Sequence, residues 1–307
     1  MKYQQYWKKI KTIFSSKDKQ TQLLFIIGVT GLILGIGLAQ MRSIEKSQQI
    51  HPLAQAVRQK HLPPKPTALM PDHNHNNKAK NYAYPTQSIR NMMENQKKLK
   101  KGKLVFLTFD DGVDPKMTPR ILDVLSKYRV PATFFVLGCN INQWSAPILK
   151  RQIAEGHAIG IHSFSHNYSL LYPNRIGNTK QILAEADKTQ DLLKKQLGKR
   201  FKARVFRYPG GHLSWSGLEA ADKQLSAKGI QWMDWNAMVG DAEPEAVRPK
   251  SVAKMLAYLD GTVKASDNPN IQVVLMHDIS SKDITLASLP NIIQYYKNRG
   301  YTFGVLE

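Results

Sequence analysis

The stretch that decides the fold is Lys103–Gly112, KLVFLTFDDG. It begins with a run of apolar and β-branched residues, which is typical of a strand buried on both faces. It ends in two adjacent carboxylates, Asp110 and Asp111, followed by Gly112. Like charges side by side at the end of a buried strand are costly unless a cation or another partner needs them there. Taken alone, these letters also fit an ordinary Asp-Gly turn.

The same arrangement, a strand that ends in a reactive side chain, recurs along residues 102–307. Apolar runs alternate there with amphipathic stretches, which predicts a parallel sheet, closed as a barrel or doubly wound. The expected strands are residues 104–109, 132–137, 158–161, 204–206, 230–235, 271–276 and 301–305. The expected helices are residues 118–128, 146–155, 179–197, 216–228, 249–259 and 286–299. In either fold, the chemistry should gather at the carboxyl ends of the strands.

The third expected strand is followed by HSFSH, which places His162 and His166 four positions apart. That spacing puts two imidazoles on one side of a turn or short helix, as metal-binding pairs often require. Asp111, from another strand end, would add a carboxylate oxygen. Three protein ligands with an open fourth position are typical of a catalytic zinc site. We therefore expect Zn²⁺, although the same ligands also suit Co²⁺, Mn²⁺ or Fe²⁺.

Three further strand ends carry polar residues. The fourth reads RYPGG, where Arg207 is a fixed cation that would lower the pKa of a neighbouring carboxylate. Gly210 lies in a bare turn able to present its backbone N–H. The fifth and sixth strands end in MDWN and LMHD, so that Asp234 beside His277 would make an oriented imidazole able to transfer a proton. Singly, each motif also fits an ordinary turn, and Trp235 fits either a groove wall or the core.

In this order and at strand ends, TFDDG, HSFSH, RYPGG, DWN and LMHD resemble the five motifs of the polysaccharide deacetylases, carbohydrate esterase family 4. The resemblance covers about residues 103–307. It implies a distorted (β/α) barrel with seven or eight strands and a metal-dependent N- or O-deacetylase. One position departs from the pattern. The third motif often has an aromatic residue before its last glycine, where this chain has Gly210.

Matching the motifs residue by residue implies a role for each position. The implied metal ligands are Asp111, His162 and His166. The implied catalytic residues are Asp110 as general base, Arg207 as its partner, Gly210 as oxyanion-binding amide, His277 as general acid and Asp234 as the residue that orients it. The residues expected to contact substrate are Leu275, in the pocket for the acetyl methyl group, with Tyr208 and Trp235.

The amino-terminal third has a different composition. Residues 1–22 carry six lysines, and residues 23–39 form a 17-residue apolar run without charge. This pattern predicts a cytoplasmic segment at 1–22, a transmembrane signal-anchor at 23–41 and an extracellular remainder. A cleaved signal peptide is the alternative. Residues 42–101, rich in proline and carrying 12 basic and 3 acidic side chains, are expected to form a disordered stalk among anionic wall polymers before a catalytic domain at 102–307.

Charge and cysteine content narrow the function further. The net charge is +21, but residues 1–101 hold 18 basic and 4 acidic side chains, so most of the surplus flanks the apolar run. That position favours a membrane or polyanion setting over nucleic acid. The single cysteine, Cys139, excludes an intrachain disulfide. We therefore expect a membrane-tethered enzyme that removes acetyl groups from peptidoglycan N-acetylglucosamine. Chitin oligomers, an exopolysaccharide or O-acetylated xylan are alternative substrates, and a catalytically silent glycan-binding module is the rival.

Overall fold

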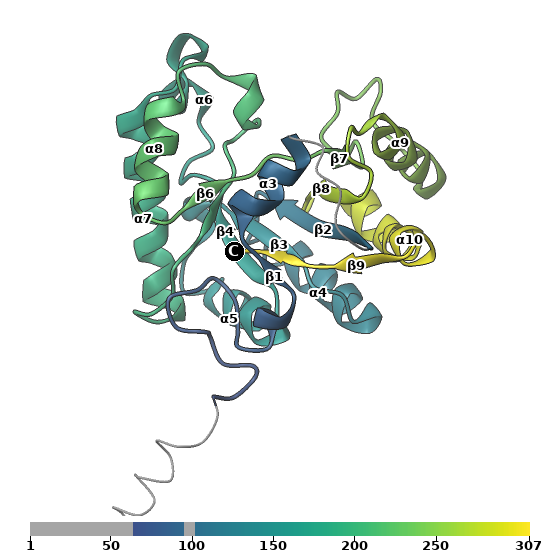
Figure 1. Cartoon of the computed structure of the whole chain (residues 1–307), viewed down its shortest axis with the longest axis horizontal. Helices are drawn as coiled ribbons and strands as arrows, with labels where there is room; N and C mark the ends of the chain where they lie inside the picture. Colours follow the sequence, from purple (N-terminus) through teal and green to yellow (C-terminus); the bar gives the residue numbers. More distant parts are fainter. Residues whose placement is uncertain (1–63, 95–101) are drawn as a thin grey trace, which may run out of the picture. The chain divides into compact units, whose positions relative to one another are not determined.

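The computed structural model describes residues 64–94 and 102–307 (Figure 1). Its strands are β1 (Ala83–Tyr84), β2 (Lys103–Asp110), β3 (Thr133–Val136), β4 (Ala158–Ile161), β5 (Val205–Phe206), β6 (Gln231–Trp232), β7 (Ala237–Met238), β8 (Ile271–His277), β9 (Tyr301–Phe303) and β10 (Val305–Leu306). Its α-helices are α3 (Thr86–Glu94), α4 (Met117–Tyr128), α5 (Ala146–Glu155), α6 (Tyr168–Leu171), α7 (Thr179–Leu197), α8 (Glu219–Ala227), α9 (Val252–Ala265) and α10 (Asp283–Asn298). Short 3₁₀ helices are η1 (Ala79–Asn81), η2 (Gly138–Asn140), η3 (Pro173–Arg175) and η4 (His212–Ser214).

The main sheet is parallel, and its strand order is β6-β5-β4-β3-β2-β8-β7, with β9 pairing with β2. β2 lies at its centre, and its pairing with β8 sets Asp110 level with His277. The edge strands β6 and β7 follow one another in the chain but lie at opposite ends of the order. The result is a curled α/β sheet, as the barrel prediction requires. All seven expected strands are present, and β1, β7 and β10 are additional.

Alternate residues of β2 face two different layers. Val105, Leu107 and Phe109 belong to the large core between the sheet and the surrounding helices. Leu104 and Phe106 belong to a smaller cluster inside the curl. Because side chains alternate along a strand, Asp110 continues this inner row and points into the curl. Burial on both faces also explains why β2 reads as an unbroken apolar run.

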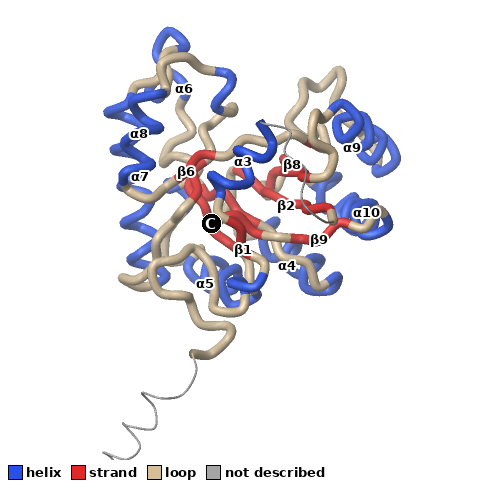
Figure 2. The backbone as a smooth tube through the Cα atoms, in the orientation of Figure 1, coloured by secondary structure: helices blue, strands red, loops and turns tan. Residues whose placement is uncertain are grey.

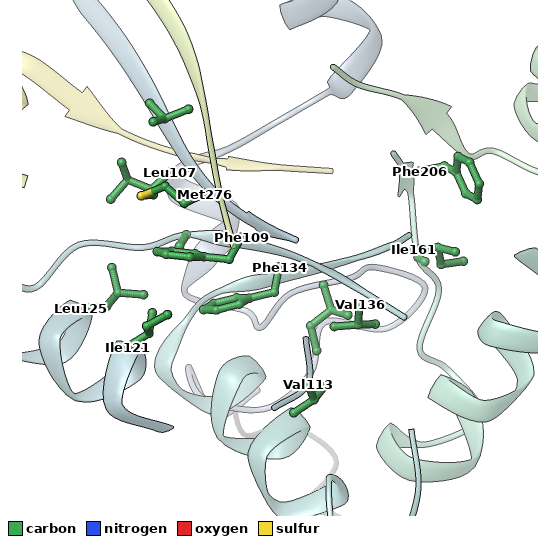
Figure 3. Close-up of a cluster of buried hydrophobic side chains, with 14 of the residues drawn as sticks. Leu107, Phe109, Val113, Ile121, Leu125, Phe134, Val136, Ile161, Phe206 and Met276 are labelled. Carbon is green, nitrogen blue, oxygen red and sulfur yellow. The ribbon is translucent and has the colours of Figure 1, made fainter. Parts of the chain in front are cut away.

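Helices cover the outer face of the sheet, as Figure 2 shows. α7 packs against α8, and α10 packs against both α9 and α4. Figure 3 shows part of this core, in which the rings of Phe109 and Phe134 stack with centroids 5.2 Å apart. Ile121 and Leu125 of α4 pack beside them. This packing fixes the strands whose carboxyl ends carry the polar motifs.

Residues 64–94 belong to the folded unit, which begins at Pro64 and not at residue 102. β1 pairs with β10, and Ile89 of α3 joins Leu306 in the inner cluster. His75 is fully buried, with Nε2 2.9 Å from a carboxylate oxygen of Glu307. The expectation of a disordered stalk is therefore wrong for this segment, because its few apolar residues fill the curl.

The remaining amino-terminal predictions lie outside the described residues. These are the cytoplasmic segment at 1–22, the signal-anchor at 23–41 and the stalk at 42–63 and 95–101. Within residues 64–94 and 102–307, none of the helices combines the length and the apolar character that a membrane span needs.

Candidate active site

A cleft of about 370 Å³ opens at the carboxyl ends of the strands, a volume typical of small-molecule sites. The predicted site residues that line it are Asp110, Asp111, His162, His166, Gly210, Trp235, Leu275 and His277. A larger hollow, of about 860 Å³, lies beside Arg129 and Lys297, near the amino ends of β3 and β4, and contains none of these residues. The chemistry therefore lies in the smaller cleft.

Asp111, His162 and His166 converge so that one ligand atom from each lies within 4.8 Å of the others. Oδ1 of Asp111 is 3.6 Å from Nε2 of each histidine. Asp111 follows β2 and His162 follows β4, and these strands are separated only by β3. The sheet therefore brings together two parts of the chain that lie about fifty residues apart.

The three side chains fit a divalent cation. Oδ1 of Asp111 is buried and has no hydrogen-bond partner within the described residues, a costly state that a bound cation would relieve. Nδ1 of His162 lies 2.8 Å from the carbonyl oxygen of Arg207, so Nδ1 carries the proton and Nε2 presents its lone pair to Asp111. Burial lowers the pKa of His162 to about 3, which keeps the imidazole neutral, the form that binds metal.

The HSFSH loop is held in place by Glu185 of α7. Its carboxylate accepts hydrogen bonds from the backbone N–H groups of Phe164 and Ser165 and from the Ser165 hydroxyl. Both Asp111 and His166 adopt positive φ, at 73° and 56°, a conformation that non-glycine residues rarely take. Strained backbone of this kind persists where neighbouring contacts enforce it, and such positions cluster at functional sites.

Asp110 pairs with Arg207 inside the curl. Oδ1 of Asp110 accepts a hydrogen bond from Nη1 of Arg207 at 2.9 Å, and both side chains are buried. Thr108, two residues earlier on the same face of β2, accepts a second bond from Nη1 at 2.7 Å. Burial raises the pKa of Asp110 and outweighs the opposing charge of Arg207, so the net shift is opposite to the one expected from the sequence.

The structure corrects the partner of His277. Nδ1 of His277 lies 2.9 Å from Oδ1 of Asp241. Oδ2 of Asp241 accepts hydrogen bonds from the backbone N–H of His277 and from the Thr285 hydroxyl. Burial alone would lower the pKa of His277, but the Asp241 carboxylate overcomes it and raises the pKa to about 9. The imidazole is therefore protonated at neutral pH.

Asp234, the partner expected from the sequence, has a different task. Its carboxylate accepts hydrogen bonds from the backbone N–H groups of His212 and Leu213, and so fixes the turn that follows Gly210. The expectation is wrong because Asp234 follows β6, at the opposite end of the strand order from β7, the strand next to β8. Asp241 follows β7 and therefore reaches His277.

Of the three residues expected to contact substrate, Leu275 and Trp235 line the cleft. Tyr208 does not. Its side chain is fully buried in the outer core, and its hydroxyl donates to Oδ1 of Asp222 at 2.8 Å. Alternation along β5 explains this correction, because Arg207 points into the curl and its neighbours Phe206 and Tyr208 point out.

Asp241, Glu185 and Tyr168 are the site residues that the sequence did not reveal. Asp241 follows the short apolar run 237–239, whose pairing with β8 was the missing signal. Glu185 lies within a long helix, and only the folded chain brings it to the HSFSH loop. Tyr168 follows that loop and lines the cleft. No local pattern in the sequence marks either of the last two.

Comparison with known proteins adds independent evidence. A family model described as polysaccharide deacetylase matches residues 97–227. The chain is 31% identical over 205 residues to a peptidoglycan-N-acetylglucosamine deacetylase of Bacillus cereus. The aligned region covers 66% of this chain and 69% of that protein. It is similar to the structure of a Streptococcus mutans CE4 esterase, with 68% identity and a TM-score of 0.77, over 80% of this chain and 100% of that one. A family 4 acetyl xylan esterase from Clostridium thermocellum, solved with a cobalt ion, is 28% identical with a TM-score of 0.53, over 66% and 88% of the two chains.

Proposed function

The chain belongs to the polysaccharide deacetylase family (carbohydrate esterase family 4) and is therefore a hydrolase, and we propose that it removes N-acetyl groups from peptidoglycan N-acetylglucosamine with a divalent metal ion. One observation carries the proposal. Three possible metal ligands, a buried carboxylate and a protonated imidazole meet in one cleft. A protein that only binds glycan has no use for the last two.

Asp111, His162 and His166 would hold the ion. Two imidazole nitrogens and one carboxylate oxygen suit Zn²⁺, and Co²⁺, Mn²⁺ or Fe²⁺ could replace it. The similar acetyl xylan esterase was solved in complex with a cobalt ion, which supports metal binding by this chain. When bound, a divalent ion lowers the pKa of water towards ~7 and polarises the acetyl oxygen.

Asp110 acts as the general base. Arg207, which also donates to the Thr108 hydroxyl, holds its carboxyl group, and Oδ2 lies 3.8 Å from Nε2 of His162, next to the metal position. Its carboxylate takes a proton from the water that attacks the acetyl carbon. A pKa above the usual value makes it a stronger base than an exposed aspartate.

Gly210 supplies a backbone N–H to the oxygen that becomes negative during attack. Its φ of +78° places it in a conformation that suits glycine, and it lines the cleft. Within the described residues its N–H donates to no other group. Such an amide contributes on the order of 3 kcal/mol when it is aimed at the developing charge.

His277 then donates its Nε2 proton to the departing nitrogen as the carbon–nitrogen bond breaks. An amine leaves poorly without a proton, so amide hydrolysis needs this donor. Asp241 holds the imidazole in the required charge state through Nδ1. Acetate and a free amino sugar are the products. Leu275 and Trp235 provide apolar surface for the acetyl methyl group.

The test is acetate release by the full chain from defined polymers, with and without a chelator. We expect release from N-acetylglucosamine polymers, loss with chelator and recovery with added Zn²⁺. The similarity to an acetyl xylan esterase makes O-acetylated xylan the second candidate substrate. Release from xylan alone would contradict the N-acetyl assignment, and release unaffected by chelator would contradict the metal.

We also propose that residues 23–41 anchor the protein in the cell membrane in a single pass, with the catalytic unit outside. The uncharged run at 23–39 and the six lysines before it support this orientation. Protease added to intact cells should then digest the catalytic unit and spare a tag placed before residue 1. A digested tag and a protected catalytic unit would mean the reverse orientation.

A further inference from the structure

Gly210 has no side chain, and the side chains of other residues fill the space beside it. A Cβ atom built on Gly210 would lie 3.2 Å from the hydroxyl oxygen of Tyr168 and 3.2 Å from Cζ2 of Trp215. These separations are shorter than ordinary van der Waals contact. Tyr168 and Trp215 therefore occupy the position into which a side chain at residue 210 would extend.

Trp215 is firmly held. Its indole Nε1 donates a hydrogen bond to the carbonyl oxygen of Pro209 at 2.8 Å. Its ring stacks on Tyr172, with centroids 4.1 Å apart and planes 12° apart. Tyr168 meets the same indole edge-on, with centroids 5.2 Å apart. Contacts of this kind fix ring orientation as well as position, so Tyr168 rests on a rigid support.

Tyr168 faces the cleft from this support. It lies two residues after His166, and its ring centroid is 5.1 Å from that of His166. The side chain lines the cleft and remains 43% exposed. Within the described residues its hydroxyl makes no hydrogen bond. Tyr168 thus offers an aromatic face and a free hydroxyl beside the metal position.

We infer that Tyr168 binds the sugar ring that carries the acetyl group, from the space that a side chain at residue 210 would occupy. A ring with a polar tip matches a pyranose, which has apolar C–H faces and hydroxyl groups at its edge. The acetyl methyl group is placed elsewhere, because Leu275 lies on β8, which is separated from β4 by β3 and β2. This inference rests on the proposed function and adds a specificity-determining residue to it.

The experiment compares two substrates of the full chain, an N-acetylglucosamine polymer and p-nitrophenyl acetate, which has an acetyl group but no sugar. Tyr168→Ala should raise the KM for the polymer about tenfold, and Tyr168→Phe about threefold, since a site that loses a hydrogen bond to substrate binds it less well. Hydrolysis of p-nitrophenyl acetate and zinc affinity in calorimetry should stay within about twofold of wild type. Tyr128→Ala is the matched control, because Tyr128 is a partly exposed tyrosine that does not line the cleft.

Two results would overturn the inference. An unchanged KM in Tyr168→Ala would show that the side chain does not contact the sugar. An equal loss on both substrates with normal zinc affinity would place Tyr168 at the acetyl group. The same variants should also be assayed on O-acetylated xylan. If the wild type acts on xylan alone, the proposed substrate is wrong, but a raised KM of Tyr168→Ala on xylan still supports the sugar contact and an unchanged KM refutes it.

Discussion

His162 and His277 are both buried at the carboxyl ends of strands in one cleft, yet at neutral pH the imidazole of His162 is neutral and that of His277 is positively charged. Burial lowers the pKa of His162 to about 3, whereas Asp241 overcomes burial and raises that of His277 to about 9. The difference lies in the partner of Nδ1, which is a backbone carbonyl for His162 and a carboxylate for His277. One side of the cleft therefore offers lone pairs to a cation, and the other holds a proton for the leaving group.

The largest effect is expected on the metal side. His162→Ala should abolish zinc binding and lower turnover on the order of 10³-fold, because a bound ion supplies several kcal/mol of transition-state stabilisation. Calorimetry with Zn²⁺ and acetate release measure the two losses. His73→Ala, which removes a histidine outside the cleft, should change neither. If His162→Ala still binds zinc, His162 is not a metal ligand, and its contrast with His277 fails.

On the acid side, Asp241→Asn should change the pH dependence. The wild type should lose activity as the pH rises through about 9, where His277 loses its proton. Loss of the Asp241 carboxylate lowers the pKa of His277, so the variant should lose activity at a lower pH. At pH 8 the loss should be about 10²-fold, the contribution of a general acid, and smaller at pH 6. The profile of kcat/KM from pH 5 to 10 measures this. Asp234→Asn is the control, and its activity should still fall near pH 9, as in the wild type.

The same pair should make stability depend on pH. The pKa of His277 rises from 6.5 to about 9 on folding, which corresponds to about 3 kcal/mol at 1.36 kcal/mol per pKa unit. Because the folded pKa is the higher one, this stability is fully present below about pH 6.5 and is lost as the pH rises through about 9. Urea unfolding of the chelator-treated protein at pH 6 and pH 10 tests it. In Asp241→Asn, the free energies of unfolding at pH 6 and pH 10 should differ less than in the wild type. Equal free energies of unfolding at the two pH values in the wild type would argue against a charged His277.

The smallest effect is expected outside both sides of the cleft. Tyr208→Phe removes the hydroxyl that donates to Asp222 and should cost about 1 kcal/mol of unfolding free energy. Since Tyr208 faces the outer core, KM and turnover should stay within about twofold of wild type. Denaturant titration and acetate-release kinetics measure the two quantities. A raised KM with unchanged stability would show that Tyr208 contacts the substrate, as expected from the sequence.

The metal side could be predicted from the sequence and the acid side only in part. Asp111, His162 and His166 lie in short motifs at strand ends, and a parallel sheet brings such ends together whatever its strand order. The partner of His277 depends on which strand lies beside β8. Two-residue strands such as β7 leave little periodic signal, so Asp234 and Asp241 were not distinguishable.

The folded segment 64–94 escaped prediction for a related reason. Its contacts, such as β1 with β10 and His75 with Glu307, join residues more than two hundred positions apart. Its composition of prolines and polar residues fits a stalk, and Ile89 is buried only because the folded sheet provides the inner cluster that it joins. Tyr208, by contrast, was predictable, because it follows Arg207 and adjacent strand residues face opposite sides.

The most direct test is the zinc affinity of two variants of adjacent residues, Asp110→Asn and Asp111→Asn, measured by calorimetry alongside acetate release. The two changes are chemically identical, but only Asp111 belongs to the metal group, while Asp110 pairs with Arg207. We predict that Asp110→Asn binds zinc like the wild type and releases almost no acetate, and that Asp111→Asn loses at least about 100-fold in zinc affinity. Equal zinc affinity in the two variants, or an active Asp110→Asn, would contradict this division of roles.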